Sequence, residues 1–485
     1  MAKKYTKAAT ANKQQTAPVC VKGMPTSVTN AKVSFPKTTA WTLAEARNAK
    51  ATPENTVPSF EEGQIIQLWP GKQSWDNWRV TNMLNEIADV KGFQVLIALI
   101  RNEDADFSSG ERIGYFYSKD GIHYRVGGLL FGEEGSLYHD CREWSGSTVL
   151  RDNGTLQTFY TLSRGVKFGN EWQTEQRLAT AIQNVRVSDD GEHLYIDAPH
   201  VHTLIRGCES PDGFYYETPE QAAEREAKWP TRHNYKIGSD QTDNNCDRDP
   251  HFFCDPKTRA EYLFFEGNTG AGYHAPGVIR EQYVGGAVEG LAPTEDMMKA
   301  NGCVGVIELT NELGTFGIRR APWLVTNLLT DEIERINVIY HQDHYYLFCV
   351  CHGNKHSLNA ENPEFFVNRD FLLGWRAKEL GGALTPLNGT GVVLTQKSFG
   401  AMYSGQMENR QYTYSWQLNS RNGQTGNRFP VVSYANFCRH AETGEIRQIM
   451  NAGPSFEIEL DGLTSRVTDL MYDILPADDK QLPLI

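Results

Sequence analysis

Short segments rich in aromatic and β-branched residues recur along the chain, and they restrict its fold more than any other property of the sequence. Turn signals such as Lys119-Asp120-Gly121 and Asp152-Asn153-Gly154 separate them, so each segment is predicted to be a β-strand. The predicted strands occupy residues 93–100, 112–118, 155–162, 261–265, 337–351, 411–418, 429–435 and 456–460. Because no helical unit recurs between them, the sequence predicts an all-β architecture. Both a propeller and a large sandwich fit, since no sequence repeat is legible.

Composition indicates a globular protein with a substantial core. Of 485 residues, 40% are hydrophobic and 22% are charged, which is too little charge for general disorder. The net charge is −13, from 47 basic and 60 acidic side chains. This balance argues against nucleic acid or an anionic membrane as a partner, because both attract surplus Lys and Arg. No apolar run approaches the roughly 20 residues that cross a bilayer.

The domain organisation is predicted to be simple. Residues 1–36 lack apolar periodicity and are expected to form a flexible arm, whereas residues 37–485 are expected to form one domain. Capping patterns at Thr42 and Thr218 predict two short helices. The N-terminus has no secretory h-region, and the nine cysteines are scattered. A cytoplasmic location is therefore expected, with export by a route that needs no classical signal left open.

Two motifs place acidic or hydroxyl residues beside tryptophans. In the W-D-x-W motif at residues 75–78, strand alternation is expected to direct Trp75 and Trp78 to one face and Asp76 to the other. In the E-W-S-G-S motif at residues 143–147, Trp144 beside Ser145 is typical of a sugar-stacking platform. Each has a plain alternative, since the first fits a core strand with a water-facing Asp and the second fits a turn before a strand.

Two later motifs combine carboxylates with arginine. In R-D-P, Arg248 is expected to orient the Asp249 carboxylate and hold it ionised, and the alternative is a salt-bridged surface turn. In D-E-I-E-R, residues 331–335, Glu332 and Glu334 are two apart and share a face if the segment is a strand. Their repulsion and burial would raise the pKa of one of them, as a general acid requires. The alternative here is an acidic loop in solvent.

The order of these motifs carries more information than any one of them. W-D-x-W, E-W-S-G-S, R-D-P and D-E-I-E-R follow one another, with YLFFEGNTG at residues 262–270 and YYLF at residues 345–348 between or after them. In this order the chain resembles glycoside hydrolase family 68, the levansucrase, inulosucrase and β-fructofuranosidase family. The resemblance covers residues 60–440.

This resemblance implies a five-bladed β-propeller with a central acidic pocket and a few peripheral helices. It implies a retaining enzyme that cleaves sucrose through a covalent fructosyl-enzyme and passes fructose to water, sucrose or a fructan chain. Asp76 matches the nucleophile, Asp249 the transition-state stabiliser and Glu334 the general acid/base. The residues that match substrate-binding positions are Trp75, Trp144, Ser145, Arg248, Glu332, Arg335, His352, Tyr414, Asn244 and Glu266. Sucrose and fructo-oligosaccharides are the partners that this match implies.

Three departures from the family pattern qualify the match. Arg79 stands where the family usually has Pro, and it is expected to alter the strand entry or add a surface charge. His352 falls at a position that is Arg or His in the family and that affects product length. At the calcium site of some members, Asp243 and Asp331 are plausible ligands, but His274 replaces an amide donor. Because calcium prefers oxygen ligands, no metal or other cofactor is expected.

Two other readings of the function remain. A propeller without catalytic activity that binds fructosides or glycans would have lost at least one of the three carboxylates, and a related glycosidase acting on other furanosides would lack the tryptophan-flanked motifs. Elsewhere, His200 and His202 have the spacing of metal ligands, but no third ligand is evident. Cys349 and Cys351 are expected to be packing residues.

Overall fold

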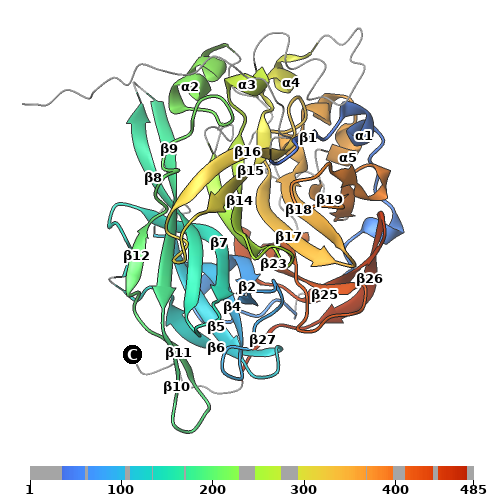
Figure 1. Cartoon of the computed structure of the whole chain (residues 1–485). Helices are drawn as coiled ribbons and strands as arrows, with labels where there is room; N and C mark the ends of the chain where they lie inside the picture. Colours follow the sequence, from blue (N-terminus) through green and yellow to red (C-terminus); the bar gives the residue numbers. More distant parts are fainter. Residues whose placement is uncertain are drawn as a thin grey trace, which may run out of the picture. The chain divides into compact units, whose positions relative to one another are not determined.

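The computed structural model describes residues 35–60, 64–103, 110–133, 135–168, 171–228, 246–274, 293–366, 369–396, 410–440 and 446–477. Within the compact unit Phe35–Ile485, five sheets form the blades of a β-propeller (Figure 1). The all-β architecture that the strand pattern predicts and the five-bladed propeller that the family resemblance implies are therefore confirmed. The predicted arm lies outside the described residues apart from Phe35 and Pro36, and Phe35 packs against the ring of Tyr262 with centroids 5.4 Å apart.

Each blade is built mainly from strands that follow one another in the chain and pair antiparallel. Blade 1 contains β2 (Lys72–Arg79), β4 (Gln94–Asn102), β5 (Arg112–Ser118), β6 (His123–Leu129) and β27 (Leu475–Pro476). Blade 2 contains β7 (Arg142–Leu150), β8 (Leu156–Phe168), β9 (Glu171–Gln183), β12 (Val201–Leu204) and β3 (Thr81–Asn82). Blade 3 contains β13 (Asp247–Cys254), β14 (Glu261–Asn268), β15 (Gly302–Leu309), β16 (Gly317–Val325) and β1 (Thr39–Ala40).

The last two blades each carry one extra strand beside a longer one. Blade 4 contains β17 (Glu334–His341), β18 (His344–His352), β19 (Asp370–Ala377), β20 (Thr385–Pro386) and β21 (Val392–Thr395). Blade 5 contains β22 (Arg410–Leu418), β23 (Arg428–His440), β24 (Ile446–Ala452), β25 (Ser455–Asp461) and β26 (Thr464–Tyr472). Outside the blades lie the β10–β11 hairpin (Val185–Val187, Leu194–Ile196) and the helices α1 (Leu43–Arg47), α2 (Pro219–Lys228), α3 (Ala271–His274), α4 (Glu295–Lys299) and α5 (Pro363–Phe366).

The first strands of the blades, β2, β7, β13, β17 and β22, contact one another in a closed ring, so each contributes its side chains to a common axis. The second strands are buried on both faces. In β4, the residues between Gln94 and Asn102 are all buried, because a blade packs against a neighbouring blade on either side. This explains why the strands read as continuous apolar runs in the sequence.

All five inner strands have a register irregularity near the middle, a β-bulge in which extra residues face the partner strand. In each inner strand, one residue is the last to pair before the bulge. We call these five residues the pre-bulge set: Trp75, Trp144, Arg248, Glu334 and Tyr414. We call the next residue the bulge set: Asp76, Ser145, Asp249, Arg335 and Ser415. Four members of the bulge set have positive φ, between 43° and 60°, which is rare for residues other than glycine. The five blades thus share a structural repeat that the sequence does not reveal.

The bulge in β2 also corrects the reasoning about W-D-x-W. Residues three apart, such as Trp75 and Trp78, fall on opposite faces of a regular strand, so alternation does not place them together. In the structure they pair with Leu99 and Ile97, which are two apart and share a face. The extra residues of the bulge, starting at Asp76, restore the common orientation.

The local predictions hold for the elements that flank the site. The β17–β18 hairpin turns at Gln342 and Asp343, both with positive φ, as the polar turn predicted. Helices begin after Thr42 and Thr218, and in α1 the Thr42 hydroxyl accepts from the Glu45 amide at 3.1 Å. By contrast, E-W-S-G-S lies within β7 and R-D-P within the buried strand β13, so the alternative readings of these motifs as turns are wrong.

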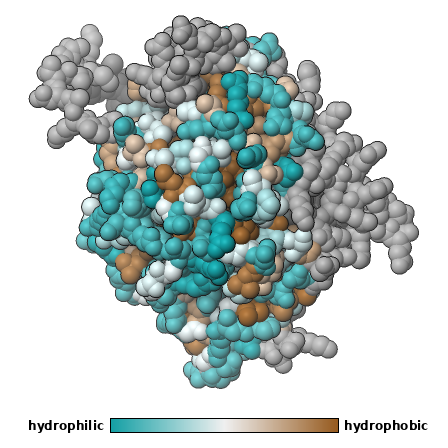
Figure 2. Space-filling model, turned by 90° about the vertical axis from the view of Figure 1, so that its right-hand side faces the viewer, coloured by the Kyte–Doolittle hydropathy of each residue, from teal (hydrophilic) through white to brown (hydrophobic). Residues whose placement is uncertain are grey.

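Hydrophilic side chains dominate the face of the described residues that Figure 2 shows. The view in Figure 2 is largely hydrophilic over the described residues, with apolar side chains in scattered groups. Among the described helices, none combines the length and apolar character needed to span a bilayer. The surface charge suggested for Arg79 is wrong, because this side chain ends β2 and is only 8% exposed.

Gly146 offers a test of how tightly the bulge in β7 is built. A Cβ at this position would lie 1.9 Å from the backbone oxygen of Phe159 on β8, so Gly146→Ala must push the two strands apart. We expect a loss of roughly 1–3 kcal/mol in the free energy of unfolding, measured by urea denaturation. Gly426→Ala is the control, because nothing lies within 4 Å of its added Cβ. Equal stabilities of the two variants would contradict this description.

Candidate active site

Three carboxylates from three different blades meet at the propeller axis. Asp76 comes from β2, Asp249 from β13 and Glu334 from β17. Carboxylate oxygens of Asp249 and Glu334 lie within 4.8 Å of one another, with Glu266 of β14 in the same group. The charges of Asp249 and Glu334 both act on Asp76. The three residues singled out from distant motifs therefore form one cluster.

Asp249 is fixed from both sides. One carboxylate oxygen accepts from the hydroxyl of Ser145, and the other accepts from the backbone N–H of Arg335 at 3.1 Å. Its own N–H donates to the Thr161 hydroxyl at 2.9 Å. With both oxygens bonded and only 6% of the residue exposed, Asp249 has a single orientation toward the axis.

Asp76 has a pKa raised to about 6, chiefly because burial disfavours its charged form. Arg335 opposes this by attraction, while Asp249 and Glu334 add repulsion. The elevated carboxyl pKa that the sequence suggested for the Glu332 and Glu334 pair is thus found in the cluster at Asp76. At neutral pH Asp76 is mostly ionised and only weakly stabilised, which suits a nucleophile.

Glu334 is held at both oxygens. Arg248 Nη2 donates to Oε1 at 3.1 Å, and the Tyr414 hydroxyl donates to Oε2 at 2.6 Å. A hydroxyl can donate to an ionised carboxylate and accept from a protonated one, so the Tyr414 contact serves Glu334 in both states. Burial, reinforced by the charge of Glu334, raises the pKa of Tyr414, which therefore stays protonated. The Glu334 side chain remains 21% exposed.

Arg248 does not hold Asp249, which corrects the expectation from R-D-P. Its guanidinium donates to both oxygens of Glu266, at 2.7 and 3.1 Å, and reaches Glu334 as well. Glu266 is fully buried and also accepts from the backbone N–H of Ile333 at 3.1 Å. Both residues lie at the bulge of β13 and both reach the cluster, Arg248 through Glu266 and Glu334 and Asp249 through Ser145.

Glu332 and His352 form a second charged pair beside Glu334. Glu332 Oε1 accepts from the backbone N–H of His352 at 2.6 Å and lies 2.8 Å from its Nδ1, and Lys355 Nζ lies 3.7 Å from Oε2. Burial alone would lower the pKa of His352, but Glu332, the buried Asp370 and Glu334 raise it well above its usual value. These carboxylates therefore favour the charged form of His352. Its ring lies against that of Tyr414, tilted by 35° with centroids 4.1 Å apart.

The two predicted tryptophans occupy the pre-bulge positions of β2 and β7. Trp75 is 9% exposed with Arg101 over its ring at 5.3 Å, and Trp144 is partly exposed with Arg142 over its ring at 5.1 Å. An indole face that a cation covers on one side leaves the other for stacking. Trp144 is the more accessible of the two.

Two groups in the cluster have enough donors for a metal ion: Glu332, Glu334 and His352, and Asp249, Glu266 and Glu334. In the first group Nδ1 of His352 lies 2.8 Å from Glu332, and in the second the oxygens of Glu266 and Glu334 accept from Arg248, so these atoms are engaged in contacts within the protein. For the calcium site, Asp243 and the side chain of His274 lie outside the described residues, so the expectation of no calcium stays a prediction.

One predicted site residue is not described by the structure, and two residues near the site were not predicted from the sequence. Asn244 lies outside the described residues. Asp370 was not foreseen, although it is buried, pairs with His352 in the β18–β19 register, and has a pKa raised to about 6 by burial. Thr161, which holds the Asp249 N–H, lies on a second strand without any motif.

Cys349 and Cys351 are core residues, as expected, and His202 contacts Tyr160 at 2.6 Å within an aromatic cluster.

The chain is similar to known proteins of one enzyme family over most of its length. The family model described as levansucrase/invertase, glycoside hydrolase family 68, matches residues 29–473. A levansucrase of Fructilactobacillus sanfranciscensis is 30% identical over 71% of this chain and 40% of its own length. One from Bacillus amyloliquefaciens is 32% identical over 70% of this chain and 71% of its own length. The structure of an inulosucrase from Halalkalicoccus jeotgali bound to kestose is 27% identical, with a TM-score of 0.67 over 92% of this chain and 99% of that one.

Asp76→Asn is expected to stabilise the fold in a pH-dependent way. The folded state resists ionisation of Asp76, so the wild type loses stability as pH rises from about 4, its ordinary pKa, through about 6, its folded pKa. The variant does not. Above pH 6 its free energy of unfolding should exceed that of the wild type, by at most about 3 kcal/mol. Denaturation at several pH values measures this, and the exposed Asp189→Asn is the control. A constant difference across this range would contradict the assigned pKa.

Proposed function

This chain belongs to glycoside hydrolase family 68, the levansucrase and invertase family, and we propose that it cleaves sucrose by a retaining mechanism and transfers the fructosyl group to water, sucrose or a fructan chain. The observation that carries the proposal is the meeting of Asp76, Asp249 and Glu334 at one axis from three separate blades. A retaining glycosidase needs two carboxyl groups flanking one bond, and this cluster supplies them.

The first step uses Asp76 and Glu334 in complementary roles. Asp76 attacks the anomeric carbon of the fructosyl unit, while Glu334 donates its proton to the glycosidic oxygen, so glucose leaves and a fructosyl-enzyme ester forms. Glu334, now ionised, takes a proton from the incoming hydroxyl, which attacks the same carbon and releases Asp76. The Tyr414 hydroxyl supports this change of protonation, because it can donate to or accept from Glu334.

Asp249 is the proposed transition-state stabiliser. Its orientation is fixed by Ser145 and by the backbone of Arg335 before any substrate arrives. Bonds from fructosyl hydroxyls to a fixed carboxylate tighten as positive charge develops on the sugar, and this differential binding lowers the barrier. Arg335 keeps Asp76 ionised in the same step, because its charge opposes the effect of burial.

The remaining residues around the cluster are proposed to bind the sugars. Trp75 and Trp144 offer indole faces, and the Arg248–Glu266 and His352–Glu332 pairs offer charged partners for hydroxyl groups. His352 is partly exposed and lies 3.8 Å from Glu334, so it borders the position where the leaving glucose and the incoming acceptor bind in turn. The relatives named levansucrase and the inulosucrase bound to kestose support sucrose and fructo-oligosaccharides as the partners.

Incubation with sucrose tests the proposal directly. We expect the purified protein to release glucose, and Asp76→Ala to abolish this release because no ester can form, while the variant keeps its fold by circular dichroism. Asp189→Ala, which removes an exposed carboxylate, should leave the rate unchanged. If the wild type releases no glucose but binds fructosides, the chain is a propeller that binds sugars without catalysis. Turnover of other furanosides alone would indicate a different glycosidase.

Glu334→Gln distinguishes the acid role from a structural one. The variant cannot donate a proton, so its kcat/KM for sucrose should fall by roughly 100-fold or more. Formation of the fructosyl-enzyme from an activated donor such as a fructosyl fluoride needs no proton, and its burst should be largely retained. Rapid-quench measurement of the burst with both donors separates the cases. A loss of the same size with both would contradict the assignment of Glu334 as the acid.

A further inference from the structure

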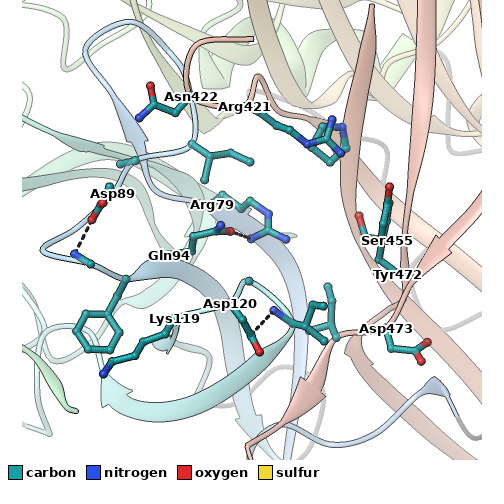
Figure 3. Close-up of a pocket in the computed structure, with 18 residues that line it drawn as sticks. Arg79, Asp89, Gln94, Lys119, Asp120, Arg421, Asn422, Ser455, Tyr472 and Asp473 are labelled. Carbon is teal, nitrogen blue, oxygen red and sulfur yellow. Dashed lines mark hydrogen bonds between the residues drawn. The ribbon is translucent and has the colours of Figure 1, made fainter. Parts of the chain in front are cut away.

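A cavity whose lining does not include the three carboxylates lies at the junction of the first and last blades. It has a volume of about 460 Å³ and is bordered by the end of β2, by turns of blade 1, and by residues of blade 5. We call it the Arg79 pocket, after the side chain at its centre in Figure 3. Arg79 is the last residue of β2 and follows Asp76 by three positions.

Arg79 is a buried cation whose contacts are all neutral. It is 8% exposed, and its Nη1 atom donates to the Tyr124 hydroxyl at 2.6 Å and to Gln94 Oε1 at 3.1 Å. Across the described parts of the chain, no carboxylate forms an ion pair with it. Both of these bonds start from Nη1, so neither of them uses Nε or Nη2. A buried guanidinium without a counter-charge is unfavourable, and an anion in the pocket would remove that cost.

Three acidic residues border the pocket, but none of them forms an ion pair with Arg79, and each has at least one carboxylate oxygen bonded to another group. Asp120 accepts from the backbone N–H groups of Ile122 and His123 at 2.8 Å and from the His123 ring at 2.7 Å. Asp89 accepts from the N–H of Gly92. Asp473 accepts from Gln64 at 2.7 Å, and in Figure 3 its carboxylate points away from Arg79.

Further donors surround the space in front of Arg79. Lys119 and Arg421 lie at opposite borders, and the exposed amide of Asn422 lies next to Arg421. Lys119 pairs with Glu192 at 2.6 Å and lies over the Phe93 ring, and Arg421 pairs with Glu457 and donates to the backbone oxygen of Arg428 at 3.0 Å. An anion that has oxygens on several sides can accept from Lys119 and Arg421 at the two borders as well as from the Arg79 guanidinium.

We propose that the Arg79 pocket is a binding site for a phosphate group, either free or carried by a small sugar phosphate. Arg79 binds two phosphate oxygens through Nε and Nη2, which is the geometry that guanidinium and phosphate share. The other oxygens face the donors at the borders. A volume of about 460 Å³ is large enough for a hexose phosphate. Neither the family match nor the proposed reaction assigns a ligand to this position.

Binding here has a physical consequence for the whole ring. The pocket joins residues of blade 1 to residues of blade 5, which are the two ends of the propeller in sequence. A ligand that contacts both blades stabilises their association, and binding to the folded state alone raises the unfolding temperature as ligand is added. The site therefore predicts a saturable stabilisation by phosphate.

Titration of the full chain tests the proposal. Sodium phosphate and glucose 6-phosphate, each compared with sodium chloride at equal ionic strength, are added while thermal unfolding and binding heat are measured. We expect saturable binding and a raised unfolding temperature with at least one of them. If inorganic phosphate binds as tightly as the sugar phosphate, the site recognises the phosphate alone. If the sugar phosphate binds more tightly, the sugar contributes too.

Two variants locate the binding. Arg79→Gln removes the anchor, and Asn422→Asp places a negative charge at the mouth through one exposed side chain, so it decides the matter even if Arg79→Gln fails to fold. Each should weaken phosphate binding at least about tenfold. Asn184→Asp, the same change at an exposed residue outside the pocket, should have no effect. No saturable binding, or equal binding by Asn422→Asp and Asn184→Asp, would overturn the proposal.

Discussion

The arrangement of the site depends on Arg335, which connects three inner strands. Its backbone N–H, freed by the bulge in β17, donates to Asp249 of β13. Its guanidinium donates to the backbone oxygen of Asn77 in β2 at 2.8 Å and lies over the Trp78 ring. The same charge lowers the pKa of Asp76, which burial raises. Arg335 is only 2% exposed, so it lies inside the ring of inner strands. There it links β17 to β13 and β2, and it also supplies the positive charge beside the carboxylates.

The bulges explain why so few positions carry so much of the chemistry. Five strands that converge on an axis can each direct only one or two side chains to a common point, and the bulge determines which ones. The pre-bulge and bulge sets together contain Asp76, Asp249 and Glu334 and most of the proposed sugar contacts. The positive φ values at four of these positions cost free energy that the surrounding blades must offset. A catalytic geometry of this kind therefore requires a large and well-packed fold around it.

The sequence predicts those features of the fold and the site that depend on a local pattern of residue types. The strands, the polar turn at Gln342 and Asp343, and the order of the motifs follow from local patterns, so the fold class and the three carboxylates could be predicted. The five-fold repeat could not, because the bulges are a property of pairing and their residues differ from blade to blade. For the same reason the predicted partner of Arg248, Asp249, was wrong, and the buried Asp370 was not predicted at all. Both depend on which strands lie side by side, and no local motif records that.

Two buried arginines on inner strands, Arg335 of β17 and Arg79 of β2, show why an unpaired charge is informative. Arg335 and Arg79 have similar exposure, and both bond neutral oxygens. Arg335 also acts on the charge of Asp76, so its burial is compensated by the carboxylate cluster that it serves. No carboxylate among the described residues forms an ion pair with Arg79, although it borders an open cavity. A fold that needed only a space-filling residue there would be more stable with an apolar one, so the retained charge argues for an anionic ligand.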